Sequence, residues 1–217
     1  MRKAVAALLM IVFCFACAVS PAEESGELTF QGIPWFSSPE ESVLHLFETG
    51  FMGSELTGNK ISELYQIQPV LSGSFIATDP ADENVPYTFQ SGKITPVTSK
   101  LQRLKIPPAK LAQTIAGQAP SWLHLDFTAE PENPRLVECC FSFKSGDYDE
   151  KAVYDALVQA YGEPDAVKDK NRISIWLGDN NTIIVFRKKD LIFASLDGLT
   201  LAENVGLSGE EATDTDI

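Results

Sequence analysis

The chain contains two histidines, so a mechanism with histidine as the general base must use one of them. His45 lies beside the apolar positions of a predicted helix, which favours a structural role. His124 and Asp126 are two residues apart in a predicted strand, so they share one face and could act as a base and its orienting group. Cys140, in the next predicted strand, would supply a thiol nucleophile. One hypothesis is therefore a hydrolase centred on Cys140, His124 and Asp126.

The alternative is that these residues form the polar outer face of a half-exposed sheet, which needs no chemistry. The sequence has no Gly-x-Ser-x-Gly motif, no phosphate-binding glycine-rich loop, and no His or Cys spacing typical of metal ligands. Because Cys139 and Cys140 are adjacent, they cannot link distant segments by a disulfide. We expect Cys139 in the core and Cys140 as a partly exposed thiol. The sequence therefore predicts no catalytic site, no metal and no cofactor.

Tryptophans are the second group of residues with a candidate function. Trp122 and Trp176 are expected on the faces opposite the main aliphatic stripes of their strands, where aromatic side chains can anchor a partner. They could instead fill a second small core under residues 51–69 or under a long loop at 96–110. The predicted binding residues are Trp122, His124, Asp126 and Trp176.

Local signals in the first half of the chain predict the elements that would support such a site. Ser38-Pro39-Glu40-Glu41 supplies an N-cap, a first-turn proline and a capping-box glutamate. The apolar spacing that follows predicts a helix over 39–49, which Gly50 ends. Strands are expected over 70–77 and 87–90, on either side of a polar turn.

The second half of the chain shows clearer patterns. Residues 122–128 and 136–144 alternate between apolar and polar side chains, which predicts an antiparallel hairpin. A second capping box at 147–150 begins a helix that ends at Gly162. Three further strands are expected over 172–177, 182–187 and 191–196. These elements predict an α+β fold: helices packed on one face of an antiparallel β-sheet, with a helix followed by a three-strand meander at the C-terminal end.

Residues 1–22 have the features of a signal peptide. Arg2 and Lys3 precede an apolar run over 4–16, and small residues follow it. The run is shorter than the roughly 20 helical residues that cross a bilayer, so no spanning helix is expected in the mature protein. Cys17 supports a second interpretation, in which the chain is cut before this cysteine and acylated there as a lipoprotein. Both interpretations predict an extracytoplasmic protein, whether secreted, periplasmic or anchored by lipid.

The rest of the chain is expected to form a single α+β body over 23–196 and a disordered acidic tail over 197–217. An alternative is that this body consists of two degenerate half-repeats, 28–105 and 106–196. The net charge is −13, from 17 Lys+Arg against 30 Asp+Glu, which makes nucleic acid a poor partner. The basic run at 187–189 is expected to be a hairpin turn.

Two short segments resemble known families. Gly32-Ile33-Pro34-Trp35 leads into the first helix, and Tyr161-Gly162-Glu163-Pro164 ends the later helix before the meander. The later arrangement resembles small outer-membrane-assembly lipoproteins and the β-lactamase-inhibitor protein fold, and the start is similar to uncharacterised secreted bacterial proteins. The resemblance implies an extracytoplasmic protein that acts by protein contact, and it transfers no catalytic residue.

We therefore expect a non-catalytic secreted or envelope-associated bacterial protein whose partner is another protein. The alternatives from other classes are the Cys140/His124 hydrolase and a structural lipoprotein anchored through Cys17.

Overall fold

The computed structural model describes residues 26–53, 67–78, 93–144, 146, 148–168 and 173–206. The predicted signal peptide with Cys17, the strand expected at 87–90 and the chain from residue 207 lie outside the described residues. The helices are α1 (Pro39–Glu48), α3 (Glu150–Tyr161), α4 (Leu196–Leu201) and a short 3-10 helix (Pro108–Lys110). The strands are β1 (Ile67–Thr78), β2 (Lys93–Ile106), β3 (Pro120–Phe127), β4 (Leu136–Phe143), β5 (Ala166–Lys168), β6 (Ile173–Gly178), β7 (Thr182–Arg187), β8 (Asp190–Ser195) and β9 (Glu203–Gly206).

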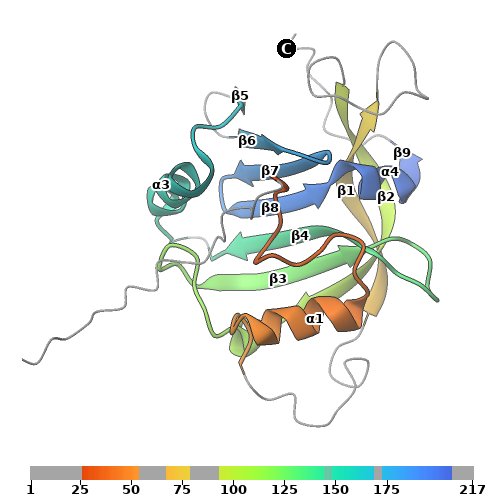
Figure 1. The fold of residues 1–217 in the computed structure, drawn as a ribbon, viewed down its shortest axis with the longest axis horizontal. Coiled ribbons are helices and arrows are strands. Elements are labelled where there is room, and N and C mark those ends of the chain that lie inside the picture. Colours follow the sequence, from red (N-terminus) through yellow and green to blue (C-terminus); the bar gives the residue numbers. More distant parts are fainter. Residues whose placement is uncertain are drawn as a thin grey trace, which may run out of the picture.

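The described strands form one antiparallel sheet in the order β1-β2-β3-β4-β8-β7-β6-β5, and β9 pairs with β2 (Figure 1). The α+β class is confirmed, as are the β3–β4 hairpin and the meander of β6, β7 and β8 that follows α3. Because all the named strands pair antiparallel, side chains directly opposite one another on neighbouring strands lie on the same face. This register determines which side chains meet on the sheet.

Helix α1 begins as its sequence predicts. The Ser38 hydroxyl accepts a hydrogen bond from the Glu41 amide at 3.3 Å, and the Glu41 carboxylate accepts one from the Ser38 amide at 2.7 Å. Two of the amides that the start of the helix leaves unpaired are thereby satisfied, and Pro39 at the first helical position has no amide N–H to satisfy. The buried side chains of α1 include Val43 and Leu46, which join the main core.

Ser38→Ala should lower the free energy of unfolding by about 1 kcal/mol, because it removes the cap on the Glu41 amide. Urea denaturation followed by tryptophan fluorescence measures this loss. The control is Glu40→Ala, which lies in the same turn and takes no part in the capping box. An equal loss in both variants would show that the box does not stabilise the helix.

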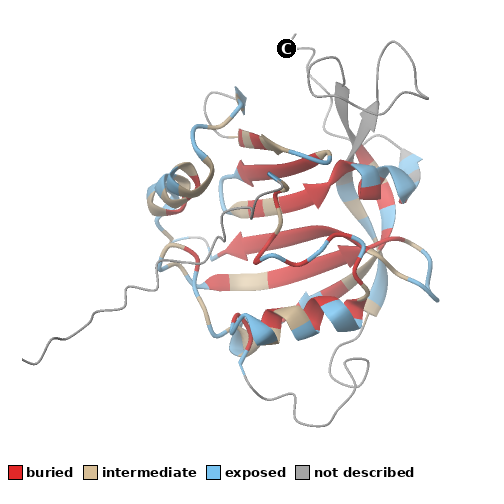
Figure 2. Cartoon of the chain, viewed as in Figure 1, coloured by how far each residue is buried: buried red, intermediate tan, exposed pale blue. Residues whose placement is uncertain are grey.

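The main core lies between the sheet and the elements packed on its first face, which are α1, α3 and the segment before α1. That segment crosses the sheet over β8 and β4 (Figure 1). Its Phe30 ring lies 5.1 to 5.5 Å from the rings of Phe51, Phe141 and Phe193. The central strands β3 and β4 are almost entirely buried (Figure 2). The sheet therefore gives the candidate residues on these strands a rigid frame.

A second, smaller core lies on the opposite face, where α4 packs. Leu196 and Leu199 of α4 pack with Leu101 of β2 and Val137 of β4. The prediction that the chain is disordered from residue 197 is wrong for 197–206. Ser195 caps α4 through the Gly198 amide at 3.1 Å, and the leucines on one side of this short helix have apolar surface to bury.

Strand β2 corrects the prediction of a long loop at 96–110. It pairs with β1 through register partners from Ile67↔Leu104 to Thr78↔Lys93, and with β3 through Gln102 to Ile106. The apolar residues of β2 do not all lie on one face of the sheet. Leu101 belongs to the second core, whereas Leu104 belongs to the main core on the other face. The boundary suggested between half-repeats, after residue 105, falls inside this strand.

Candidate functional site

The sheet face on which α4 packs, called the α4 face below, carries the sequence-predicted residues His124, Asp126 and Cys140. Asp126 lies directly opposite Arg103 on β2 and Glu138 on β4. The structure therefore brings two buried acids and one arginine into a single row across three strands.

Arg103 and Asp126 form a two-pronged ion pair. The guanidinium donates from Nε to Oδ1 at 2.7 Å and from Nη2 to Oδ2 at 2.5 Å, and Nη2 also donates to the Ser72 hydroxyl at 2.9 Å. The side chain of Asp126 is fully buried, not half-exposed as the sequence suggested. The pKa of Asp126 is raised overall, because burial raises it more than the hydrogen bonds and charge of Arg103 lower it. The paired geometry makes Asp126 the charged acid of the row.

Glu138 is the second acid of the row and is only 3% exposed. Burial and the nearby carboxylate of Asp126 raise the pKa of Glu138 to about 8, against a smaller lowering by Arg103. One arginine cannot neutralise two carboxylates, so Glu138 keeps its proton at neutral pH. Its Oε2 atom has no hydrogen-bond partner among the described residues.

His124 is 8% exposed, and its ring stacks on Trp122 with the centroids 3.9 Å apart. Neither ring nitrogen has a hydrogen-bond partner in the described part of the chain. Burial, followed by the charges of Arg103 and Lys105, lowers the pKa of His124 to about 3. The imidazole is therefore neutral over the ordinary pH range.

The spacing of His124 and Asp126 places them on one face, but they do not form a base and its orienting group. The Asp126 carboxylate is engaged by Arg103, and neither nitrogen of His124 bonds to it. Cys140 is also more buried than predicted, at 9% exposure. Burial and neighbouring carboxylates, Glu138 first, raise the pKa of its thiol well above the usual value. A protonated, buried thiol is a weak nucleophile, so the geometry does not favour the hydrolase hypothesis.

Trp176 does not lie on the exposed face where the sequence predicts it. The side chain is 1% exposed in the main core, next to Tyr154 of α3, and its indole N–H donates to the Gly162 carbonyl at 2.8 Å. Trp176 lies opposite Ile184 on β7, which belongs to the same core. The side chains of β6 that face the other way are the aliphatic ones, Ile173 and Ile175.

These aliphatic residues belong to a surface that the sequence did not reveal, a mostly apolar area on the α4 face. One register row runs from His124 through Cys140, Ile192 and Val185 to Ile175. Trp122 and Ile173 lie at the two ends of the next row, with Ser142, Asp190 and Arg187 between them. Trp122, Ile173, Ile175 and Ile192 are partly exposed. The apolar patch is defined as Trp122, His124, Cys140, Ile173, Ile175, Val185 and Ile192.

Three exposed cations lie along this apolar patch. Lys105 is the register partner of His124, while Arg187 and Lys168 both lie opposite Ile173 on the strands that flank it. We call Lys105, Lys168 and Arg187 the basic rim. The sequence does show that Ile173 and Ile175 alternate with Ser174 and Trp176, and so lie on the opposite face. It does not show which of the two faces is the main core, because that depends on where α3 packs.

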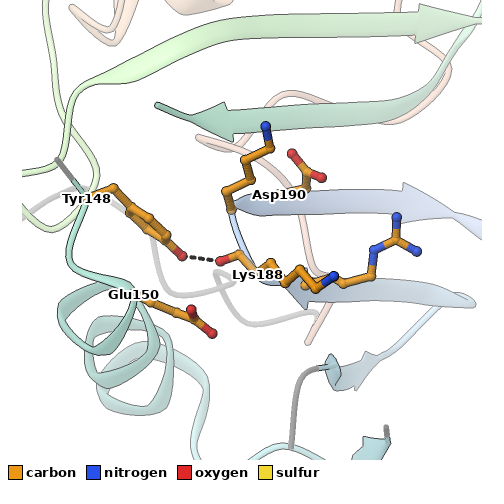
Figure 3. Close-up of a pocket in the computed structure, with 6 residues that line it drawn as sticks. Tyr148, Glu150, Lys188 and Asp190 are labelled. Carbon is orange, nitrogen blue, oxygen red and sulfur yellow. Dashed lines mark hydrogen bonds between the residues drawn. The ribbon is translucent and has the colours of Figure 1, made fainter. Parts of the chain in front are cut away.

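A shallow cavity of about 530 Å³ lies at the turn between β7 and β8 and is lined by Tyr148, Glu150, Arg187, Lys188, Lys189 and Asp190 (Figure 3). The Tyr148 hydroxyl donates a hydrogen bond to the Lys188 carbonyl, and its ring stacks on Phe143 at 4.9 Å. The hairpin turn predicted at 187–189 is confirmed. The walls carry charges of both signs, so the cavity selects no single class of ligand.

No protein-family model, curated protein or solved structure matches the chain. None of the described helices has the length and apolarity needed to cross a membrane. Within the described ranges, no group of three or more His, Cys, Asp or Glu side chains could hold a metal ion. Function must therefore be argued from the α4 face itself.

Proposed function

We propose that this chain is a non-catalytic, extracytoplasmic binding protein that holds an acidic segment of a partner protein on the apolar patch. One observation carries the proposal: partly exposed Trp122 and three partly exposed isoleucines lie beside three cations in a chain of net charge −13.

The apolar patch supplies the binding energy in this proposal. Trp122 already stacks on His124, so its ring is held in one orientation before a partner arrives. A preordered aromatic ring loses little entropy on binding, which is why tryptophan is enriched among the residues that dominate interfaces. The neighbouring isoleucines extend the apolar surface across β8 and β6.

The basic rim supplies the preference for an acidic partner. Cations around an apolar centre attract acidic segments and exclude basic ones. The negative charge of the whole chain opposes the approach of extended polyanions such as nucleic acid. A short acidic peptide segment with apolar side chains fits both conditions. The extracytoplasmic location rests on the leader-like sequence of residues 1–22.

Selection from a random peptide library on the immobilised full-length chain tests the proposal. We expect enrichment of peptides that combine Asp or Glu with apolar residues, and we expect their affinity to fall about tenfold or more in Trp122→Ala. Lys105→Glu should weaken the same peptides, with the largest difference at low salt. Titration of the selected peptides by fluorescence anisotropy measures both effects.

Two matched controls separate the apolar patch from the rest of the surface. Leu201→Ala truncates an exposed side chain of α4, and Lys151→Glu reverses an exposed charge on α3. Both should bind the peptides as the unmodified chain does. Selection of basic peptides, or equal binding by Trp122→Ala, would overturn the proposal.

A further inference from the structure

Cys140 and His124 face one another across β4 and β3. They are register partners in an antiparallel pair, so their side chains lie on the same face. The Cβ atoms of directly opposite residues in such pairs are about 4.5–5.5 Å apart. Both residues are about nine-tenths buried, with 8% of His124 and 9% of Cys140 exposed.

Both side chains have donor atoms that the protein leaves unused. Cys140 is a free thiol, and neither ring nitrogen of His124 has a hydrogen-bond partner among the described residues. Burying an imidazole without a partner costs free energy, because water no longer satisfies its nitrogens. A ligand that accepts the lone pair of one nitrogen would recover part of this loss.

The number and type of donors limit which ligand fits. Ions that need three or four protein ligands find no such group in the described residues. A thiolate and an imidazole can serve an ion that accepts two ligands, and thiolate selects soft ions such as Cu(I). An ion held by both would lie between donor atoms about 4.3 Å apart, from bonds of roughly 2.3 Å to sulfur and 2.0 Å to nitrogen. Directly opposite residues have their side chains side by side on one face, which allows such a bridge.

Charges of both signs surround the two side chains. Glu138, Asp190, Asp126 and Arg103 act electrostatically on the Cys140 sulfur, and Arg103 and Lys105 act on His124. A Cu(I) ion bound to the thiolate would leave the net charge at the sulfur as it is in the thiol, so these neighbours do not oppose it. Trp122, stacked on His124 at 3.9 Å, fixes the orientation of the imidazole. In other metal sites, a hydrogen bond from an outer residue keeps a histidine ligand in its orientation. Here the stacking on Trp122 has that role.

We propose that the Cys140 sulfur and one ring nitrogen of His124 form a two-coordinate site for a soft monovalent cation, Cu(I). On binding, the thiol proton passes to solvent as the copper–sulfur bond forms, and the imidazole donates a lone pair. Copper enters and remains as Cu(I), so no electron is transferred. Both ligands belong to the apolar patch, but copper binding needs no partner protein there, so it can be tested on the chain alone.

Anaerobic titration of Cu(I), held by a chromophoric chelator, into the full-length chain tests the proposal. Cys14→Ser and Cys17→Ser form the background, so that Cys139 and Cys140 are the remaining thiols. We expect one Cu(I) per chain, and an affinity about 100-fold lower in Cys140→Ser and in His124→Phe. Cys139→Ser is the matched control, since its side chain lies on the other face in the main core.

X-ray absorption of the copper-loaded chain gives a readout that is independent of affinity. One sulfur and one nitrogen neighbour are expected, while two sulfurs would indicate copper shared between chains and would overturn the site. Loss of Cu(I) in Cys139→Ser, or retention in Cys140→Ser, would also overturn it. Far-UV circular dichroism of each variant shows whether the fold is kept, and His124→Asn provides a second test if His124→Phe does not fold.

Discussion

Arg103→Met is expected to lower the free energy of unfolding by about 3–5 kcal/mol, because it leaves the buried carboxylate of Asp126 without its counter-charge. The guanidinium makes two contacts to that carboxylate and a third to Ser72, and the acid is fully buried. A methionine of similar length cannot replace any of these hydrogen bonds. Urea denaturation at pH 7, followed by tryptophan fluorescence, measures the loss.

Two comparisons identify the cause of this loss. Lys151→Met removes a cation from an exposed pair with Asp155, in which the lysine side chain is 80% exposed, so a change below about 1 kcal/mol is expected. The double variant Arg103→Met/Asp126→Leu removes both buried charges and should recover most of the stability lost in Arg103→Met. If Arg103→Met loses no more than Lys151→Met, the pair does not stabilise the fold in the way argued.

The elements that the sequence predicts correctly are those defined by local chemistry. Helix α1 begins at the predicted capping box of Ser38 and Glu41. Helix α3 is present as predicted, but its N-cap is Asp149, whose side chain accepts from the Ala152 amide at 3.1 Å, so the helix does not begin with the capping box predicted at 147–150. The β3–β4 hairpin follows from the alternation of the apolar side chains that face the main core. In each case the deciding interactions lie within a few residues along the chain.

The sequence fails to predict which side chains face which core in strands that lie between the two cores. In β2, the apolar side chains change from the second core at Leu101 to the main core at Leu104, so a single alternation does not run through the strand. In β6, the aliphatic residues face the second core and Trp176 faces α3. The sequence shows that two sets of side chains alternate, but only tertiary packing decides which set lies beneath the helices.

The candidate site was predicted in part for the same reason. His124, Asp126 and Cys140 do share one face, as the spacing requires. Their burial was missed, because polar side chains on a strand usually indicate a solvated face. At Asp126 this face is buried, because the second core and Arg103 lie there. Arg103 comes from a segment that the sequence predicts to be a loop.

Stability is expected to be greatest between about pH 4.5 and 6.5 and to fall on both sides, because Glu138 and His124 have pKa values shifted in opposite directions. The pKa of Glu138 rises from 4.5 to about 8 on folding. The unfolded chain therefore loses this proton first as pH rises, and stability declines from about pH 4.5 to pH 8. Asp126, Arg103 and Cys140 are the charged or titratable groups around it.

The decrease in stability at low pH is due to His124, whose pKa falls from 6.5 to about 3 on folding. The unfolded chain takes up this proton first as pH falls, so stability declines from about pH 6.5 towards pH 3. One pKa unit corresponds to about 1.4 kcal/mol, so each group alone changes the free energy of unfolding by about 5 kcal/mol over its range. Urea denaturation at a series of pH values measures the whole profile.

One variant for each group assigns the two sides of the profile. Glu138→Gln mimics the protonated acid, so it should match the unmodified chain at pH 5 and exceed its stability by about 3 kcal/mol at pH 8. His124→Phe keeps a planar ring against Trp122 and loses no described hydrogen bond. It should match the unmodified chain at pH 8 and be more stable at pH 4.

The contrast between the variants distinguishes these two groups from the other titrating residues of an acidic chain. General repulsion among the carboxylates would leave the alkaline decline in place in Glu138→Gln. A profile that keeps the same slope above pH 5 in that variant would therefore show that Glu138 is already ionised in the folded protein. The buried row would then hold two carboxylates against the single charge of Arg103, and Arg103→Met would cost more than the range given above.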